Sequence, residues 1–245
     1  REGNKIRHYA HLGTGNYHAK TAKLYTDYSL LTSDPSLCDD VHKVFLQLSG
    51  MGKTLNMKKL LHAPFTLQKT LVEKIEREAV LAEKGKGGRL IFKCNSLTDP
   101  KMIKALYKAS QAGVQCDLII RGMCCLRPGV EGVSENIKVR SIVGRFLEHT
   151  RVYYFENGGE EEVYCASADL MERNLYKRVE TCFPITAKKL AQRVINDLET
   201  YLLDNCQSWT LKTDGLYLSS AANRAEGAEE ISAQETLIDA YTQRS

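Results

Sequence analysis

The sequence has no hydrophobic run long enough to cross a membrane and no signal peptide at its start. Its apolar stretches fall well short of the roughly 18 residues that a membrane span requires. It also has little net charge, because 34 Lys and Arg stand against 30 Asp and Glu, a formal balance of +4. This charge does not indicate nucleic-acid binding, although it is compatible with a local anion site. We therefore expect no transmembrane segment, no nucleic-acid partner and a cytoplasmic protein, with association at the membrane surface left open.

The eight cysteines include no Cys-x-x-Cys pair, and the only close pair, Cys124 and Cys125, is adjacent in the sequence. Zinc sites need paired ligands at short spacing, and disulfide frameworks belong to small secreted domains. We expect neither here, and predict reduced cysteines. The first residue is Arg1 rather than Met, and an apparent strand follows at once. We therefore expect a fragment that begins inside a domain.

The sequence also lacks a complete nucleotide-binding glycine loop. The segment 49–54 reads Ser-Gly-Met-Gly-Lys-Thr, but Gln47 stands where a Walker A loop needs its first glycine. Such a loop should follow a strand and open a helix, whereas this segment ends a predicted helix. The glycine pairs at 13–15 and 87–88 do not fit the dinucleotide pattern either, and we interpret them as turns.

Strand and helix patterns alternate along the rest of the chain. Asp34-Pro35 and Asp99-Pro100 each place a capping residue before a proline, which is typical of helix starts. The run 116–120 is almost wholly apolar, as expected for a strand covered on both faces. Alternation between residues 66 and 120 predicts an α/β domain with parallel strand pairs. We expect helices at 35–48, 67–84, 100–112 and 190–202, and a peripheral helix after residue 221. We expect strands at 6–12, 89–94, 137–143, 151–155, 163–166 and 179–183, and an apolar run at 24–31. We place the domain boundary near residue 60, with the tail of a truncated domain at 1–59 and a second domain at 60–245.

Two blocks of residues carry plausible chemistry, an early block at 11–27 that contains His11 and a late block at 149–174. The late block has His149 and Arg151 at the start of a strand, followed by a hairpin that returns Ser167 and Asp169. Imidazole can attack phosphorus or transfer a proton, and arginine neutralises phosphate oxygens, so this block favours a phosphate site. The hairpin should bring Ser167 back beside His149, and we expect Asp169 or Ser167 to hydrogen-bond one ring nitrogen of His149.

Several blocks of the sequence, in order, resemble the C-terminal half of bacterial polyphosphate kinase. They read Tyr-Ala-His-Leu-Gly-Thr-Gly-Asn-Tyr at 9–17, Thr-Ala-Lys-Leu-Tyr-Thr-Asp at 21–27, Arg-Gly-Met-Cys at 121–124, Phe-Leu-Glu-His-Thr-Arg-Val-Tyr at 146–153, Phe-Glu-Asn-Gly-Gly at 155–159 and Ser-Ala-Asp at 167–169. The resemblance covers about residues 7–204. It implies a phospholipase D-like fold, with a mixed β-sheet flanked by helices and preceded by the tail of a truncated domain of the same kind. It also implies transfer of the terminal phosphate of ATP to polyphosphate through a phosphohistidine, reversibly.

The resemblance assigns roles to individual residues. His149 is implied as the general acid and a nucleotide contact, Arg121 as a phosphate-binding arginine at the end of a strand, and Tyr25 as a nucleotide contact. His11, Asn16, Ser167 and Asp169 are implied as supporting residues. We expect Arg121 and the turn at 167–169 to face the same cavity as His149.

The family's phosphorylated histidine lies in a His-x-Lys segment upstream of the Gly-Thr-Gly-Asn turn, and the ten residues before His11 contain none. We therefore expect both the nucleophile and the ligands of the family's Mg²⁺ to lie outside this chain, and the isolated chain to be inactive. The implied partners are ATP, ADP, polyphosphate and further copies of the chain. Two alternatives stay open: a phospholipase D-type phosphodiesterase, although Arg151 occupies the position of that motif's lysine, or an inactive fragment that binds polyphosphate or mediates subunit contacts.

Overall fold

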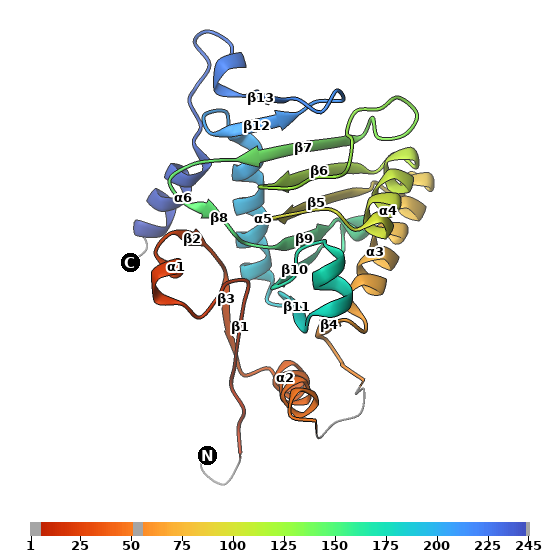
Figure 1. The fold of residues 1–245 in the computed structure, drawn as a ribbon, viewed down its shortest axis with the longest axis vertical. Coiled ribbons are helices and arrows are strands. Elements are labelled where there is room, and N and C mark those ends of the chain that lie inside the picture. Colours follow the sequence, from red (N-terminus) through yellow and green to blue (C-terminus); the bar gives the residue numbers. More distant parts are fainter. Residues whose placement is uncertain (1–5, 51–55, 244–245) are drawn as a thin grey trace.

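The computed structural model describes residues 6–50 and 56–243, and its centre is a nine-stranded mixed sheet (Figure 1). Its strands lie in the order β13-β12-β7-β6-β5-β9-β10-β11-β4. Their bounds are Leu61–Ala63 (β4), Arg89–Cys94 (β5), Gln115–Ile120 (β6), Ile137–Ile142 (β7), Val152–Phe155 (β9), Glu162–Ala166 (β10), Glu180–Pro184 (β11), Ser208–Leu211 (β12) and Tyr217–Ser219 (β13). The strands β5, β6 and β7 run parallel, as the alternation predicted, and the other neighbours are antiparallel. The expected α/β class with a mixed sheet is confirmed.

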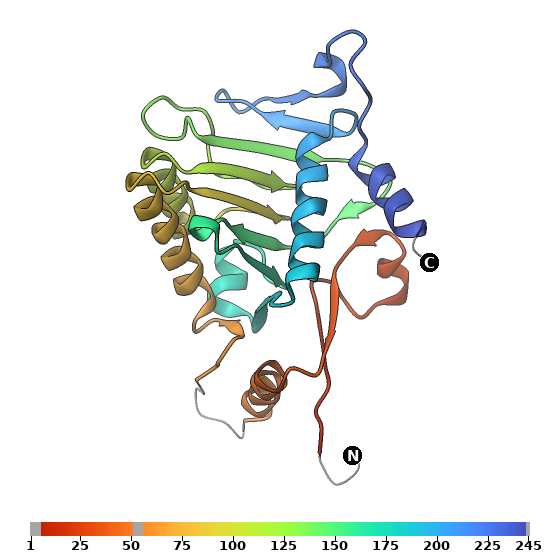
Figure 2. The same ribbon diagram turned by 180° about the vertical axis from the view of Figure 1, so that it is seen from behind.

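Helices cover both faces of this sheet, as Figures 1 and 2 show from opposite sides. Alternate residues of β5 point to opposite faces, so Leu90 and Phe92 pack in one apolar cluster with α3 and α4, while Ile91 packs in the other with α5. The helices are Ala19–Ala22 (α1), Pro35–Leu48 (α2), Leu67–Glu83 (α3), Pro100–Gln111 (α4), Lys188–Leu203 (α5) and Ala233–Thr242 (α6), with short turns at Asn157–Gly159 (η1), Arg173–Lys177 (η2) and Ala221–Asn223 (η3).

The two Asp-Pro signals mark helix starts as predicted. The Asp34 carboxylate accepts the Leu37 amide at 2.9 Å before α2, and the Asp99 carboxylate accepts the Met102 amide at 2.9 Å before α4. Each cap satisfies an amide that has no partner within its helix. The segment 49–54 falls largely on residues 51–55, which lie outside the described residues.

Residues 6–50 contribute strands to two small sheets beside the central one. Strand β1 (Ala10–Gly13) pairs antiparallel with β3 (Ser29–Thr32), so the predicted strand at 6–12 begins four residues later than expected. Strand β2 (Tyr25–Thr26) pairs parallel with β8 (Leu147–Glu148), which the sequence did not predict. Leu12 and Leu37 belong to the same apolar cluster as α5, so this part of the chain packs on the sheet.

All eight cysteines are free, and five of them are buried. Burial raises the pKa of the Cys116 and Cys165 thiols to about 12. The expectation of reduced cysteines agrees with the structure. Among the described residues, no helix is both long and apolar enough to span a bilayer.

Candidate functional site

A polar cavity of about 460 Å³ opens where the turn after β1 meets the end of β10 and the start of β9. It gathers residues 14–16, near the start of the chain, and residues between 149 and 180. Its lining residues are Thr14, Gly15, Asn16, His149, Arg151, Ser167, Asp169, Arg173, Asn174, Arg178, Val179 and Glu180. Four of the site residues predicted from the sequence therefore meet in one place: Asn16, His149, Ser167 and Asp169.

The hairpin of β9 and β10 brings the late block together as predicted. Val152 pairs with Cys165, and the amide of Ala166 donates to the carbonyl of Arg151 at 3.0 Å. His149 and Ser167 thus lie at the same end of this hairpin. The turn at 167–169 shares a cavity with His149, as expected, since Ser167 and Asp169 both line it.

The carboxylate that orients His149 is that of Asp27, which corrects the expectation that Asp169 or Ser167 would hold this ring. The His149 Nδ1 atom lies 2.9 Å from Asp27 Oδ1 and 3.0 Å from Asp27 Oδ2. Asp27 directly follows β2, and the parallel β2–β8 pair carries it to His149, which directly follows β8. Nothing local in the late block could reveal a partner 122 residues away in the sequence. The only sequence signal was the Tyr-Thr-Asp end of the second motif block.

This contact sets the protonation pattern of the ring. Since a carboxylate only accepts, Nδ1 of His149 carries the proton and donates to Asp27. Nε2 is then an acceptor, and Arg151 Nη1 donates to it at 3.1 Å. His149 is 7% exposed, and the ring of Tyr25 lies 5.0 Å from its own. Nε2, the nitrogen that Asp27 does not hold, is therefore the one that can take up or release a proton.

Asp27 is itself held in place by the turn after β1. The Thr14 hydroxyl donates to Asp27 Oδ1 at 2.7 Å and accepts the Tyr28 amide at 3.0 Å. A Cβ atom on Gly15 would lie 2.3 Å from Asp27 Oδ2, so only glycine lets this carboxylate approach. The Gly-Thr-Gly turn thus has a packing role that supports the site.

Asp169 instead holds Arg151 in a buried, bidentate ion pair. Arg151 Nε donates to Asp169 Oδ1 at 3.2 Å, and Nη2 donates to Oδ2 at 3.0 Å. Burial alone would lower the pKa of the guanidinium, but the Asp169 carboxylate raises it above its ordinary value. Asp169 also accepts the Asn95 amide at 2.7 Å. A positive charge is therefore fixed beside Nε2 of His149.

Arg121 lies at the end of β6, as predicted, but it is not among the residues that line the cavity. Its Nε donates to Asn95 Oδ1 at 3.0 Å, and the amide of the Asn95 side chain donates to the His149 carbonyl at 3.4 Å. The expectation that Arg121 and His149 share one cavity is thus not met, although a single residue links them. No carboxylate partner is recorded for Arg121 within residues 6–50 and 56–243.

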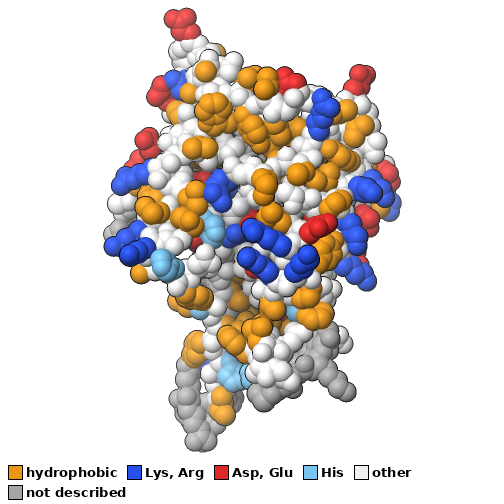
Figure 3. Space-filling model, viewed as in Figure 1, with side chains coloured by type: hydrophobic (Ala, Val, Ile, Leu, Met, Phe, Trp, Pro, Cys, Tyr) orange, Lys and Arg blue, Asp and Glu red, His pale blue; other side chains and the backbone are white. Residues whose placement is uncertain are grey.

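Two exposed arginines, Arg173 and Arg178, also line the cavity. The late block of the sequence includes Arg173, but the sequence assigned a role to neither. Neither has an ion-pair partner in the part of the chain that the structure describes. Figure 3 shows that Lys and Arg side chains gather across the middle of this face. The nearby Glu180 carboxylate is engaged elsewhere, since it accepts the Ser167 hydroxyl at 2.5 Å and the Asn174 amide at 2.7 Å. Two cations in an open cavity without carboxylate partners favour an anionic ligand.

Three of the predicted residues differ in how they relate to the cavity. Asn16 lines it through the turn after β1. His11, by contrast, lies on β1 with an exposed side chain that contacts the Tyr17 hydroxyl, and it is not part of the lining. Tyr25 reaches His149 through its ring but borders a neighbouring cavity. The structure therefore gives His11 no contact with the site.

The described residues do not provide a ready-made metal site. No group of three or more His, Cys, Asp or Glu side chains among them is placed to hold an ion. In the cavity, the Asp169 carboxylate is bound by Arg151 and that of Glu180 by Ser167 and Asn174. These residues do not fit a Mg²⁺ ion as the family would bind it, and we derive no step through one.

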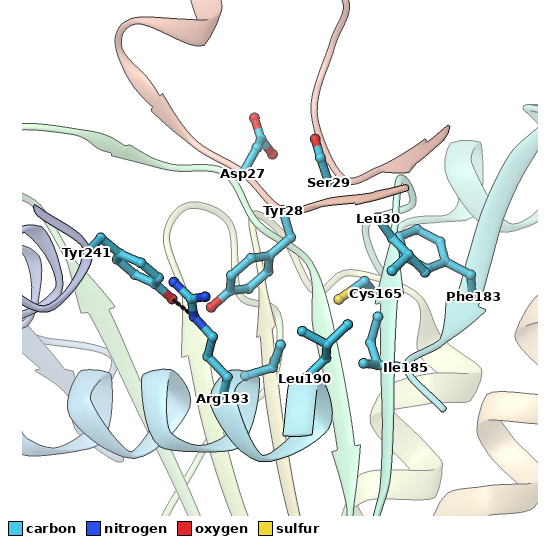
Figure 4. A pocket seen from close by; sticks show the side chains of 11 residues that line it. Asp27, Tyr28, Ser29, Leu30, Cys165, Phe183, Ile185, Leu190, Arg193 and Tyr241 are labelled. Carbon is cyan, nitrogen blue, oxygen red and sulfur yellow. Dashed lines mark hydrogen bonds between the residues drawn. The ribbon is translucent and has the colours of Figure 1, made fainter. Parts of the chain in front are cut away.

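A second cavity, of about 400 Å³, lies behind Asp27 (Figure 4). Tyr28 points into it, whereas Asp27 points away toward His149, because neighbouring residues of an extended segment face opposite sides. Its walls are mainly apolar, with Leu30, Phe183 and Leu190 among them. Its one arginine, Arg193, stacks over the Tyr241 ring at 4.2 Å. We place the functional site in the polar cavity, because there three arginines meet the imidazole that Asp27 orients.

Comparisons with known proteins agree on one family. The model described as polyphosphate kinase C-terminal domain 2 matches residues 60–234, and that described as polyphosphate kinase C-terminal domain 1 matches residues 1–54. A polyphosphate kinase of Pseudomonas aeruginosa is 66% identical over 91% of this chain, and one of Pseudomonas syringae pv. tomato is 64% identical over 98%. The chain spans about a third of the length of these relatives, 33% and 32%.

A solved structure gives the same result. The crystal structure of polyphosphate kinase from Porphyromonas gingivalis superposes with a TM-score of 0.93 at 35% sequence identity. The match covers 100% of this chain and 37% of that one.

Proposed function

Because the chain belongs to the polyphosphate kinase family, we propose that it binds nucleotide and polyphosphate and takes part in the reversible transfer of the terminal phosphate of ATP to polyphosphate. The observation that carries this proposal is the cavity in which His149, oriented by Asp27, meets Arg151, Arg173 and Arg178. Phosphoryl transfer depends mainly on positioning and on neutralising charge. This cavity supplies both.

His149 is proposed as the group that moves a proton. When the bond between the γ-phosphorus of ATP and its bridging oxygen breaks, the departing ADP oxygen gains negative charge. Nε2 of His149, protonated in place of its contact with Arg151 Nη1, gives its proton to that oxygen, while Nδ1 keeps its hydrogen bond to Asp27. In the reverse reaction Nε2 takes the proton back. The phosphoryl group itself passes to a histidine nitrogen that this chain does not supply, forming the phosphorus–nitrogen bond of a phosphohistidine.

The arginines are proposed as the phosphate contacts. Arg151 is fixed by Asp169 next to Nε2, so it can neutralise the phosphate at which bonds change. Arg173 and Arg178, which also line the cavity, can hold neighbouring phosphates of the polyphosphate. Tyr25 is proposed to contact the nucleotide. Bound Mg²⁺ with ligands outside this chain, assembly into a homo-oligomer and a cytoplasmic location stay predictions.

We expect the isolated chain to bind short polyphosphate without extending it. Titration calorimetry with inorganic tripolyphosphate should show binding that Arg178→Ala weakens by about ten-fold or more, because a hydrogen bond to a charged group contributes about 1.5–3 kcal/mol. Arg127→Ala, at an exposed arginine outside the cavity, is the matched control and should bind like the unchanged chain. If Arg178→Ala and the control bound tripolyphosphate equally well, the cavity would not be the polyphosphate-binding site. ATP-dependent elongation by the isolated chain would contradict the proposed external nucleophile.

Turnover is best measured in a hybrid enzyme, in which this chain replaces the matching third of the Pseudomonas syringae relative. There we expect Arg121→Lys to lower kcat/KM by about ten-fold or more, since an ammonium cannot reproduce the planar fork of a guanidinium. Arg121 keeps both terminal nitrogens available, because only Nε is engaged by Asn95. An unchanged kcat/KM, with unchanged nucleotide affinity, would remove Arg121 from the site.

The two alternatives give different results in the same hybrid. A phospholipase D-type phosphodiesterase would hydrolyse a phosphodiester without transferring phosphate to polyphosphate. An inactive fragment would bind tripolyphosphate, yet substitutions in its cavity would leave turnover unchanged. No contact in the structure favours either alternative over the kinase.

A further inference from the structure

The further inference concerns how the pair of His149 and Asp27 is held together, and it rests on the proposed function of that pair. The two residues come from separate parts of the chain, and within residues 6–50 and 56–243 the strand pairing beside them is the two-residue ladder of β2 and β8. So short a ladder is marginal by itself. Other interactions must fix its register.

One such interaction is a buried carboxylate that lies directly before His149. Glu148 is 2% exposed, and its Oε2 accepts the Lys93 ammonium at 2.8 Å and the Thr26 hydroxyl at 3.0 Å. Thr26 in turn accepts the backbone amide of His149 at 3.2 Å. Burial alone would raise the pKa of Glu148, but the Lys93 charge and three hydrogen bonds lower it below its ordinary value. Glu148 therefore stays ionised and ties β2 to β8.

The remaining oxygen of Glu148 is bound by a residue from the far end of the chain. Gln234, at the start of α6, donates from Nε2 to Glu148 Oε1 at 2.7 Å and to the Phe146 carbonyl at 2.9 Å. Its Oε1 accepts the Phe146 amide at 2.9 Å. The side chain is 3% exposed, and Figures 1 and 2 both show α6 beside the β2–β8 pair.

The approach of Gln234 is close enough to require a glycine opposite it. A Cβ atom on Gly144 would lie 2.6 Å from Gln234 Oε1, so a larger residue there would displace the amide. The amide of Gln234 thus pairs with both backbone groups of Phe146, as a neighbouring strand would, while also binding Glu148. Removing it would take away the partner of both Phe146 backbone groups and one hydrogen bond of the buried Glu148 carboxylate, which Tyr201 also contacts.

We propose that Gln234 is a positioning residue for His149, which acts through Glu148 to fix β8 against β2. In this arrangement α6 controls where the imidazole meets Asp27, although it contributes no group to the cavity. A displacement of about 1 Å at a reacting group can cost up to about 10²-fold in rate. The effect should therefore appear in kcat, while KM for the nucleotide changes little.

The first test measures turnover by the hybrid enzyme. Gln234→Ala should lower kcat about ten-fold or more at a temperature where the protein stays folded, with KM for ATP within about two-fold. Gln192→Ala, at an exposed glutamine of α5, is the control and should match the unchanged hybrid. In a double-mutant cycle with Glu148→Gln, the losses should be clearly less than additive, because both changes interrupt the same contact. Additive losses, or a lower Tm with unchanged kcat, would overturn the proposal.

The second test is independent of turnover. In the isolated chain, the imidazole NMR signals of His149 should move in Gln234→Ala, whereas those of His42 should not. Unmoved His149 signals would overturn the positioning role. If His149→Ala proves neutral in the hybrid, the proposed function fails, while the NMR result still decides whether Gln234 positions the ring.

Discussion

Replacing His149 by alanine in the hybrid enzyme should lower turnover by about 10²–10⁴-fold, the range that general acid–base catalysis contributes. The side chain lines the cavity and is held by Asp27 through Nδ1, so its loss removes the proton donor and leaves the Asp27 carboxylate without its imidazole partner. The fold should persist, because the ring lies between a strand end and the cavity rather than in an apolar cluster. Steady-state kinetics and thermal unfolding of the same preparation measure the two effects.

A glutamine at this position separates hydrogen bonding from proton transfer. His149→Gln can still contact a phosphate but cannot carry a proton, so it should bind nucleotide and remain as slow as His149→Ala. The control is His42→Ala, an exposed histidine of α2, which should leave turnover unchanged. Turnover at the level of the unchanged hybrid in His149→Ala would refute the assignment.

Removing the partner of Arg151 should have the largest effect on stability. In Asp169→Ala a guanidinium only 9% exposed loses both of its carboxylate contacts, and breaking a buried pair in this way costs about 3–5 kcal/mol. Asn95 also loses its acceptor. For a chain of 245 residues we expect Tm to fall by roughly 2–4 °C per kcal/mol. Calorimetry or denaturant unfolding of the isolated chain provides the measurement.

A double variant tests whether the uncompensated charge causes this loss. Arg151→Met combined with Asp169→Leu removes both charges and fills the space with apolar groups, so it should recover much of the lost stability. Asp239→Ala, at an exposed aspartate of α6, serves as the control and should unfold like the unchanged chain. A loss below about 1 kcal/mol in Asp169→Ala would mean that solvent screens the pair.

Local patterns in the sequence predicted the elements that neighbouring residues determine by themselves. Helices α2 and α4 begin at Asp-Pro pairs, where an aspartate caps an amide and proline fits the first turn. The apolar run of β6 predicted a strand covered on both faces, and residues 89–94 predicted the strand β5. The short strands β4, β8, β12 and β13 were missed, because two to four residues carry no periodicity and are held by their neighbours in the sheet.

The functional site also has residues that local sequence predicted and contacts that only the packing of distant elements creates. The sequence by itself indicated His149, Ser167 and Asp169, because one hairpin of local turns brings them together, and the structure places all three in one cavity. Only the tertiary structure decided that Asp27, rather than Asp169, orients the imidazole, and that Asp169 instead neutralises Arg151. The pairing of β2 with β8, and the contact of Gln234 with Glu148, join residues 86 or more positions apart. Such contacts depend on how separate elements pack, and no local pattern of residue types encodes them.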